Sequence, residues 1–298
     1  MPRTNRGVFC LNELPDLAER IQVALLNVLE ERDIGVRGYA LRLPLDLILV
    51  ASANPEDYTS RGRIITPLKD RFGAEIRTHY PLSLDAELAL VRQEAQLAAD
   101  GPDAGAALPG HLVEVIARFT RLVRASPAID ARSGVSARFA IAAAESAAAS
   151  AVRRAALTGE ERSVVRICDL PPVVTSLRGK VEFEVSEEGR EEEVLEHLLR
   201  RATADTFRAR LGSADLSGLL APFEGGGTVE TGELVPAAGL LSRIGEVTGL
   251  GKIMQRLGMD GSESLGHAAA AVEFALEGLY LMRRLSKDEI DGGAVYRT

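Results

Sequence analysis

The sequence predicts an α/β protein in which a small parallel sheet precedes a long helical region. Apolar runs at 7–11 and 45–53 each end abruptly in polar residues, which is typical of parallel strands buried on both faces. A helical pattern and a hairpin pattern separate the two runs. From residue 83 onward the apolar spacing is helical and includes an Ala-rich stretch at 137–157.

Polar side chains follow both predicted strands. The first run, which holds Val8, Phe9 and Leu11, ends on Asn12 and Glu13, and the second ends on Asn54. In open α/β sheets, ligands bind at the carboxyl edge of the strands. Four apolar residues followed by an acidic pair outline a Walker B strand, with Asn12 where Asp is usual. Alone, the first run fits equally well a core strand that continues into a polar turn.

The segment between the strands and the segment after them complete the first region. Asp16 and Glu19 have the spacing of a capping box for a helix that ends near Asp33. Two short alternating runs at 34–43 predict a β-hairpin around Gly38. A short helix at 67–73 and a strand at 74–78 follow. About 80 residues with this order correspond to half of a doubly wound domain.

Helices are expected through most of the remaining chain. They are predicted at 84–99, 110–123, 137–157, after Asp169, at 187–210, at 237–257 and at 263–286, with a Gly-rich flexible linker at 212–236. We therefore expect three parts, at 1–82, 83–180 and 181–298. The apolar stripe at 268–285 fits a partner helix or, as we favour, packing against its own chain. The Gly249–Lys252 stretch lacks the spacing of a phosphate-binding loop and is expected to belong to a helix hairpin.

Composition excludes several classes of protein. The 298 residues are 46% hydrophobic and carry a net charge of −8, and 181–298 is the acidic part, so nucleic-acid binding is not expected. Cys10 and Cys168 lie far apart and the four histidines form no cluster, which argues against a disulfide framework or a zinc site and favours a cytoplasmic location. No apolar run approaches a membrane span of about 20 residues, and the first residues lack the apolar core of a signal peptide.

Three motifs resemble a known family. They are FCLNELPDL at 9–17, the hairpin before LILVASANPED at 47–57, and PLKDRFG at 67–73. Together they resemble AAA+ ATPases, most closely the magnesium-chelatase I-subunit-like branch, over about 3–180 and most strongly over 7–80. The resemblance implies the back half of a P-loop αβα core with a pre-sensor β-hairpin, then an all-helical lid and a helical C-terminal extension.

The resemblance also implies residue roles. Glu13 would orient the attacking water as the Walker B glutamate, and Asn12 would support Mg²⁺ through a metal-bound water. Asn54 would be sensor 1. Either Arg61 or Arg63 would be the arginine finger that reaches a neighbouring subunit's nucleotide. Arg71 would be a second trans-acting arginine, unless it forms a salt bridge with Asp70 or Glu75. Arg138 would be sensor 2, with Arg132 as the alternative.

The family's Walker A loop, which binds the phosphates of ATP, should precede Walker B, and only five residues precede Arg6. We therefore expect either an N-terminally truncated ATPase or a misassigned start, and no ATP hydrolysis by this chain alone. The implied parent uses ATP and Mg²⁺ in a hexameric ring and remodels, or loads metal onto, a partner such as a von Willebrand A-type domain protein. The alternatives are a non-catalytic interaction module and a transcriptional regulator or helicase of the same superfamily.

Overall fold

A computed structural model describes the chain except residues 36–41, 55–62, 98–104, 132, 246 and 260–263. The chain forms two compact units, Met1–His79 and Tyr80–Thr298. The predicted parts 83–180 and 181–298 both lie in the second unit. The protein is of mixed α/β class, and within the described residues no helix has the length and apolar character needed to cross a membrane.

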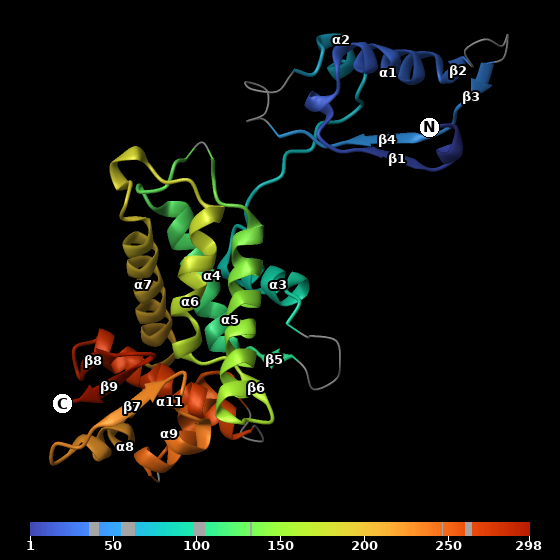
Figure 1. Ribbon diagram of the computed structural model, residues 1–298. Coiled ribbons are helices and arrows are strands. Elements are labelled where there is room, and N and C mark those ends of the chain that lie inside the picture. Colours follow the sequence, from blue (N-terminus) through green and yellow to red (C-terminus); the bar gives the residue numbers. More distant parts are fainter. Residues whose placement is uncertain (36–41, 55–62, 98–104, 132, 246, 260–263) are drawn as a thin grey trace. The chain divides into compact units, whose positions relative to one another are not determined.

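The first unit is built on two parallel strands, β1 (Val8–Leu11) and β4 (Ile48–Ala51) (Figure 1). Between them in the chain lie the 3-10 turn η2 (Leu14–Asp16), helix α1 (Glu19–Glu31) and the antiparallel pair β2 (Asp33–Gly35) and β3 (Arg42–Pro44). The expected hairpin is therefore present, although its centre lies outside the described residues. Helix α2 (Thr66–Lys69) follows, and the 3-10 turn η1 (Pro2–Thr4) begins the chain.

One face of this two-stranded sheet is covered and the other is not. Leu11, Leu49 and Ala51 pack against a small core formed by Leu14 and by residues of α1 and α2. The opposite face carries Val8, Ile48 and Val50, with 54%, 64% and 50% of their surface exposed. The expectation that these strands are buried on both faces is wrong for the described residues, because helices pack on one side only.

Two local predictions in this unit are also wrong. Asp16 does not cap α1, because Leu17 and Ala18 are extended and Ala18 occupies the cap position without a side-chain hydrogen bond. Residues 74–78 form no strand, and Ile76 is almost fully exposed there. An apolar alternation becomes a strand only where a neighbouring strand accepts its hydrogen bonds, and no such partner is described at 74–78.

The second unit begins as a helical bundle. Its helices are α3 (Leu84–Glu94), α4 (Gly110–Ala125), α5 (Ala137–Thr158), α6 (Pro171–Leu177) and α7 (Glu191–Leu211). Helices α4 to α7 lie side by side (Figure 1). Short elements connect them: the parallel pair β5 (Ala106–Ala107) and β6 (Ser163–Val164), and the 3-10 turns η4 (Ile167–Asp169), η5 (Arg178–Lys180) and η6 (Val185–Glu187).

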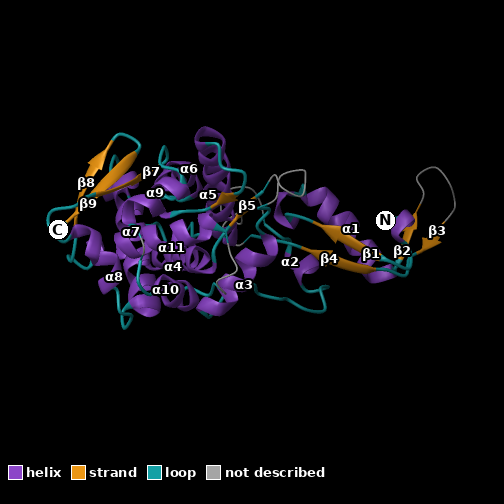
Figure 2. Ribbon diagram, turned by 90° about the horizontal axis from the view of Figure 1, so that it is seen from below, coloured by secondary structure: helices purple, strands orange, loops and turns teal. Residues whose placement is uncertain are grey.

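The C-terminal part is not purely helical. After α8 (Ser217–Leu220) and η7 (Ala221–Phe223), the strands β7 (Val229–Gly232), β8 (Ser286–Ile290) and β9 (Gly293–Arg297) form an antiparallel sheet of order β7-β9-β8 (Figure 2). The remaining helices are α9 (Ala237–Ile244), α10 (Leu250–Arg256) and α11 (Leu265–Leu281). Residues 212–236 are therefore no flexible linker, because Leu219, Phe223 and Val229 are buried in the core.

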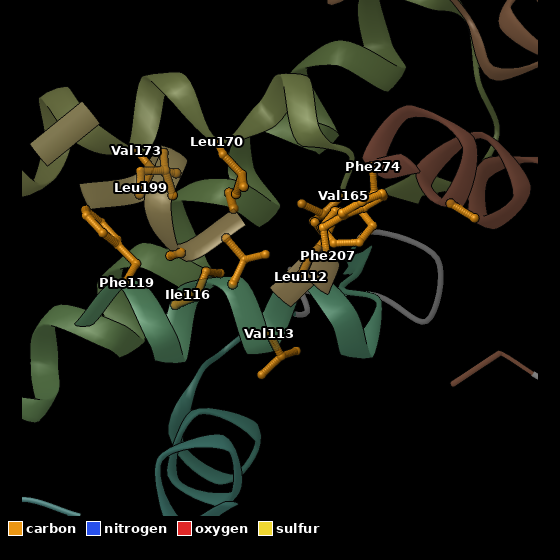
Figure 3. Packing of buried hydrophobic residues seen from close by; sticks show 14 of the residues in the cluster. Leu112, Val113, Ile116, Phe119, Val165, Leu170, Val173, Leu199, Phe207 and Phe274 are labelled. Carbon is orange, nitrogen blue, oxygen red and sulfur yellow. The ribbon is translucent and has the colours of Figure 1, made fainter. Parts of the chain in front are cut away.

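One hydrophobic core joins the bundle to this C-terminal part (Figure 3). Helix α11 is buried on all sides over 269–279, so the favoured packing of the last helix against its own chain is confirmed. Phe274 of α11 stacks with His111 of α4 and with Phe207 of α7. A β-carbon at Gly278 would lie 1.9 Å from the Phe207 ring, so glycine is required where α11 approaches α7.

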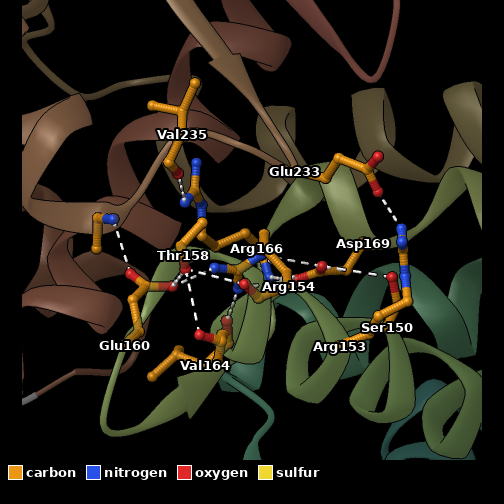
Figure 4. Close-up of polar contacts among 12 residues, drawn as sticks. Ser150, Arg153, Arg154, Thr158, Glu160, Val164, Arg166, Asp169, Glu233 and Val235 are labelled. Atoms are coloured by element: carbon orange, nitrogen blue, oxygen red, sulfur yellow. Dashed lines mark hydrogen bonds and ion pairs between the residues drawn. The ribbon is translucent and has the colours of Figure 1, made fainter.

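Two buried arginines hold the same junction (Figure 4). Arg154 on α5 donates to Asp169, to Glu160 and to the Val164 carbonyl, over distances of 2.6–3.1 Å. Arg166 donates from Nε to Glu273 Oε2 at 2.6 Å and from Nη1 to the Val235 carbonyl at 2.7 Å. The two Arg166 bonds join the end of the bundle to α11 and to the segment before α9.

Cys10 and Cys168 differ in their surroundings. Cys10 lies on the uncovered face of the first sheet and is exposed, whereas burial raises the pKa of the Cys168 thiol well above its usual value. Because the thiolate is the reactive form, we predict that iodoacetamide at pH 7.5 labels Cys10 at least tenfold faster than Cys168. Mass spectrometry of the C10S and C168S variants measures both rates. Equal labelling of the two thiols would contradict this arrangement.

His111 makes stability depend on pH. The side chain is fully buried, and burial is the main cause that lowers its pKa from 6.5 to about 3. The unfolded chain therefore binds a proton below pH 6.5 that the folded chain does not bind, so stability present above pH 6.5 is lost as pH falls toward 3. Between pH 7 and pH 5 this residue alone should lower the free energy of unfolding by about 2 kcal/mol.

The variant H111L tests this link by urea unfolding at both pH values. The variant should lose about 2 kcal/mol less than the wild type on going from pH 7 to pH 5, because leucine cannot take up a proton. If the two proteins lose stability in parallel, His111 is not the group responsible.

Candidate functional site

The candidate site lies at the carboxyl edge of the first sheet. Strands β1 and β4 are parallel and in register, with Leu11 opposite Ala51, so both chains leave the sheet at the same edge. Asn12 and Glu13 follow β1 directly, and Asn54 comes three residues after β4. All three are exposed. The side chains that the sequence singled out at the two strand ends therefore belong to one edge of one sheet.

Ser52 ties the two strand ends together. Its hydroxyl accepts a hydrogen bond from the Glu13 backbone N–H at 3.2 Å and donates one to Asn12 Oδ1 at 3.4 Å. The Ser52 carbonyl accepts from the Leu14 N–H at 2.9 Å. The sequence pattern did not single out this serine, although a hydroxyl inside the apolar run at 45–53, two residues before Asn54, was available as a signal.

Glu13 adopts an unusual backbone conformation. Its φ of 52° and ψ of 55° lie in the left-handed region, which a residue with a β-carbon occupies at a cost. Strain of this kind is of order 1–3 kcal/mol and clusters at functional sites, where the surrounding hydrogen bonds maintain it. The Ser52 bonds at and on either side of Glu13 supply that support for the backbone at the sheet edge.

The edge offers oxygen atoms that suit a hard cation. Mg²⁺ prefers carboxylate, amide and water oxygens, which Asn12 and Glu13 can supply. Within the described ranges, however, no group of three or more His, Cys, Asp or Glu side chains is arranged to hold a metal. The donors therefore fit a Mg²⁺ ion that keeps most of its waters and takes further ligands from elsewhere, as it does when bound to nucleotide phosphates.

One of the two candidate arginine fingers, Arg63, can be placed near α1. Arg61 lies outside the described residues, whereas Arg63 is exposed and its carbonyl accepts from Gln22 Nε2 at 3.0 Å. Gln22 is itself buried, bonds the Leu17 carbonyl, and accepts from the Ile65 N–H at 3.0 Å. This glutamine therefore attaches the segment with Arg63 to helix α1, a role that its sequence context did not reveal.

Arg71 follows α2 and is engaged within its own unit. Its Nη2 lies 2.5 Å from Glu30 Oε1 on α1, and this hydrogen bond is the main cause that raises the pKa of the Arg71 guanidinium. Asp70 and Glu75, the partners that the sequence suggested, are not the ones found. Glu75 instead pairs with Arg77. In the Arg71–Glu30 pair both side chains are exposed, so a competing anion can displace Glu30.

The remaining predicted positions lie in the second unit. Arg138 is the second residue of α5 and is exposed, and its backbone N–H donates to Ser136 Oγ at 3.2 Å. Arg132 lies outside the described residues. Gly249 is the left-handed cap before α10 and Lys252 lies within that helix, so the stretch forms the start of a helix.

Comparisons with known proteins add little to this geometry. No family model matches the chain, and no curated protein matches it. Among solved structures, the chain is similar to a crystal structure from Cytophaga hutchinsonii described as a putative ATPase, with 19% sequence identity and a TM-score of 0.26. The alignment covers 65% of this chain and 64% of that chain. A TM-score of this size does not establish a common fold.

Proposed function

We propose that this chain is the C-terminal part of an AAA+ ATPase of the magnesium-chelatase I-subunit-like type. ATP bound at the subunit interfaces of a hexameric ring would be hydrolysed to remodel a partner or to drive metal insertion by it. The observation that carries this proposal is the pairing of β1 with β4, because it gathers Asn12, Glu13 and Asn54 at one sheet edge. A polar cluster at this edge is where α/β sheets bind nucleotides.

Each residue then has a chemical task. Glu13 orients the water that attacks the γ-phosphate, and Asn54 holds that water or the phosphate from the neighbouring strand. Asn12 accepts a hydrogen bond from a Mg²⁺-bound water. An amide in place of a carboxylate lacks the charge attraction to the ion, so the nucleotide phosphates must supply more of the binding energy for Mg²⁺.

The uncovered sheet face supports a larger nucleotide-binding core. Parallel sheets are normally covered by helices on both faces, yet Val8, Ile48 and Val50 are at least half exposed. Helices from further polypeptide that cover this face would add the third layer of an αβα core. We propose that the same polypeptide carries the phosphate-binding loop, since no G-x-x-x-x-G-K-[ST] motif occurs in these 298 residues.

The exposed arginines suit action across a subunit boundary. Arg71 is held by Glu30 through a solvent-exposed and therefore weak ion pair, whereas a guanidinium that reaches a γ-phosphate accelerates phosphoryl transfer by about 10³ or more. If Arg71 left Glu30 and bound the γ-phosphate of a neighbouring subunit's nucleotide, ATP hydrolysis there would therefore be faster. Arg61 and Arg63 remain the other candidates for this role.

The second candidate is a non-catalytic interaction module. The Arg71–Glu30 pair favours it, because an arginine with a partner in its own chain needs no nucleotide. The coding sequence upstream of Met1 separates the two functions. An in-frame phosphate-binding loop after a strand supports the ATPase, and an unrelated gene or a promoter at that place supports the module.

The catalytic proposal is tested in the ATPase assembled with its phosphate-binding segment. E13Q should slow ATP hydrolysis by orders of magnitude and leave ATP affinity and assembly nearly unchanged, because only the water-orienting carboxylate is lost. E19Q changes an exposed glutamate of α1 in the same way and should keep wild-type activity. Phosphate release and nucleotide binding measure the two effects. Collapse of ATP affinity in E13Q would place Glu13 elsewhere than at the attacking water.

The trans-acting arginine is tested by mixing subunits. R61A, R63A and R71A are each assayed alone, and the variant that removes the finger should lose activity without unfolding. R77A removes the side chain of an arginine that is 89% exposed and should leave activity unchanged. Mixing the inactive arginine variant with E13Q should restore turnover, because one subunit supplies the arginine and the other the intact water site. If no mixture recovers activity, the shared interfacial site is wrong.

A further inference from the structure

The buried side chain of Gln22 fastens the segment that carries one of the candidate arginine fingers. Gln22 is the fourth residue of α1, and only 2% of its surface is exposed. The segment at 63–65 is neither helix nor strand, so no ladder of backbone hydrogen bonds holds it. Both parts belong to the first compact unit. The position of this segment therefore depends on contacts that side chains make.

The amide of Gln22 makes three hydrogen bonds. Nε2 donates to the Leu17 carbonyl at 2.9 Å and to the Arg63 carbonyl at 3.0 Å, and Oε1 accepts from the Ile65 N–H at 3.0 Å. A side-chain amide suits this environment because it carries two N–H donors and an acceptor oxygen on one carbon. The reverse orientation would set its oxygen against two carbonyls. All three partners therefore fix the same orientation of Gln22.

The bonds from Gln22 hold the backbone on the C-terminal side of Arg63. Ile64 and Ile65 pack against the small core of this unit, whereas Arg63 is exposed. Ile65 is also the N-cap residue of α2. The segment is thus anchored on the protein side by one buried amide and two apolar side chains, while the charged side chain of Arg63 remains accessible.

An arginine that acts across a subunit boundary needs a fixed backbone. Groups that take part in catalysis must be held within about 0.5 Å of the productive position, and loops achieve this only with support from neighbouring residues. A misplacement of about 1 Å can cost on the order of 10² in rate. Gln22 gives Arg63 such support. Arg71, by contrast, is bound to Glu30 of its own unit and must leave it first.

We propose that Gln22 is the positioning residue for Arg63, and that Arg63 is the arginine that reaches the neighbouring subunit's nucleotide. This inference rests on the ATPase function proposed above. Gln22 acts through the Arg63 carbonyl and the Ile65 N–H, and its bond to Leu17 holds the amide against the start of α1. Loss of the amide should therefore lower the rate of hydrolysis at the neighbour's site and leave ATP affinity nearly unchanged.

Hydrogen exchange in the chain itself tests the anchor. Q22M replaces the amide with an unbranched side chain that has no N–H donor and only a weak acceptor. Exchange of the Ile65 N–H should become at least tenfold faster. The Ser52 N–H, which donates to the Leu11 carbonyl at 2.8 Å, should exchange as in the wild type. Unchanged exchange at Ile65 would show that Gln22 does not hold the segment, and the proposal would fail.

The ATPase assembled with its phosphate-binding segment tests the role of the anchor. Q22M should lower kcat at least tenfold and keep the Kd for ATP within about twofold of the wild type. Q93M is the matched control, because Gln93 is an exposed residue of α3 and receives the same substitution. Wild-type kcat in a folded Q22M, or in R63A, overturns the proposal.

Mixed assemblies separate a defect at the arginine from a defect at the water site. Q22M mixed with E13Q should recover turnover, because E13Q supplies a well-placed arginine and Q22M supplies an intact Glu13. Q22M mixed with R63A should stay inactive, because neither subunit presents an effective arginine. Recovery with R63A alone would mean that Gln22 acts through Leu17 on its own subunit's Glu13. Recovery with neither variant would indicate a general structural defect, and both results contradict the proposal.

The mixture of R63A with E13Q distinguishes this inference from the function on which it rests. If that mixture recovers no activity, the shared interfacial site is wrong and the inference falls with it. If it recovers activity and Q22M with E13Q does not, the positioning role alone is wrong.

Circular dichroism reports the folding of each variant. If Q22M is unfolded, Q22N takes its place, since asparagine keeps the amide but is one methylene shorter and loses the reach to all three partners. The same pattern of recovery is expected, and wild-type activity in Q22N then overturns the proposal.

Discussion

The buried charges at the end of α5 unite the second unit. Arg154 and Arg166 are among the largest fully buried side chains. Arg154 takes its acceptors from the nearby stretch at 160–169, whereas Arg166 takes them from Glu273 and Val235, which are distant in the sequence. Their partners Asp169 and Glu160 belong to the same stretch of chain, and Glu160 also accepts from the Ala237 N–H at 2.7 Å. Removal of one partner from such a set leaves an unpaired buried charge, which costs about 3–5 kcal/mol. The helical bundle and the C-terminal part therefore depend on each other.

The need to pair these buried charges also determines the surroundings of Glu273 and Asp169. Glu273 pairs with Arg166 through one carboxylate oxygen, and the other oxygen, like Arg166 Nη2, is buried without a hydrogen-bond partner among the described residues. Opposing effects act on Asp169, where burial raises the pKa and the Arg154 hydrogen bonds lower it, with burial the larger cause. Polar groups in this core are thus tied into a network in which a change at one residue alters the electrostatic surroundings of the next.

In the first unit, hydrogen bonds between polar side chains and the backbone hold neighbouring segments together. The core there is small, with Leu14, Leu25 and Leu68 at its centre. Ser52 bonds the two strand ends to each other, and Gln22 attaches the segment at 63–65 to α1. A strained Glu13 at an exposed sheet edge is stable only because both of its neighbours are bonded to the adjacent strand end. The proposed water-orienting role requires such fixed placement of a carboxylate.

The sequence by itself determined the local elements with strong periodicity. The two strands, the hairpin and the Ala-rich helix from 137 followed from apolar spacing, and Asn12, Glu13 and Asn54 followed from polar residues at strand ends. Tertiary structure alone decided which strand faces are covered and that β7, β8 and β9 pair into a sheet. It also decided that Arg71 meets Glu30 and that Arg166 meets Glu273, 107 residues away. These depend on contacts between distant segments. A pattern of local spacing carries no information about the partner that a distant segment will provide.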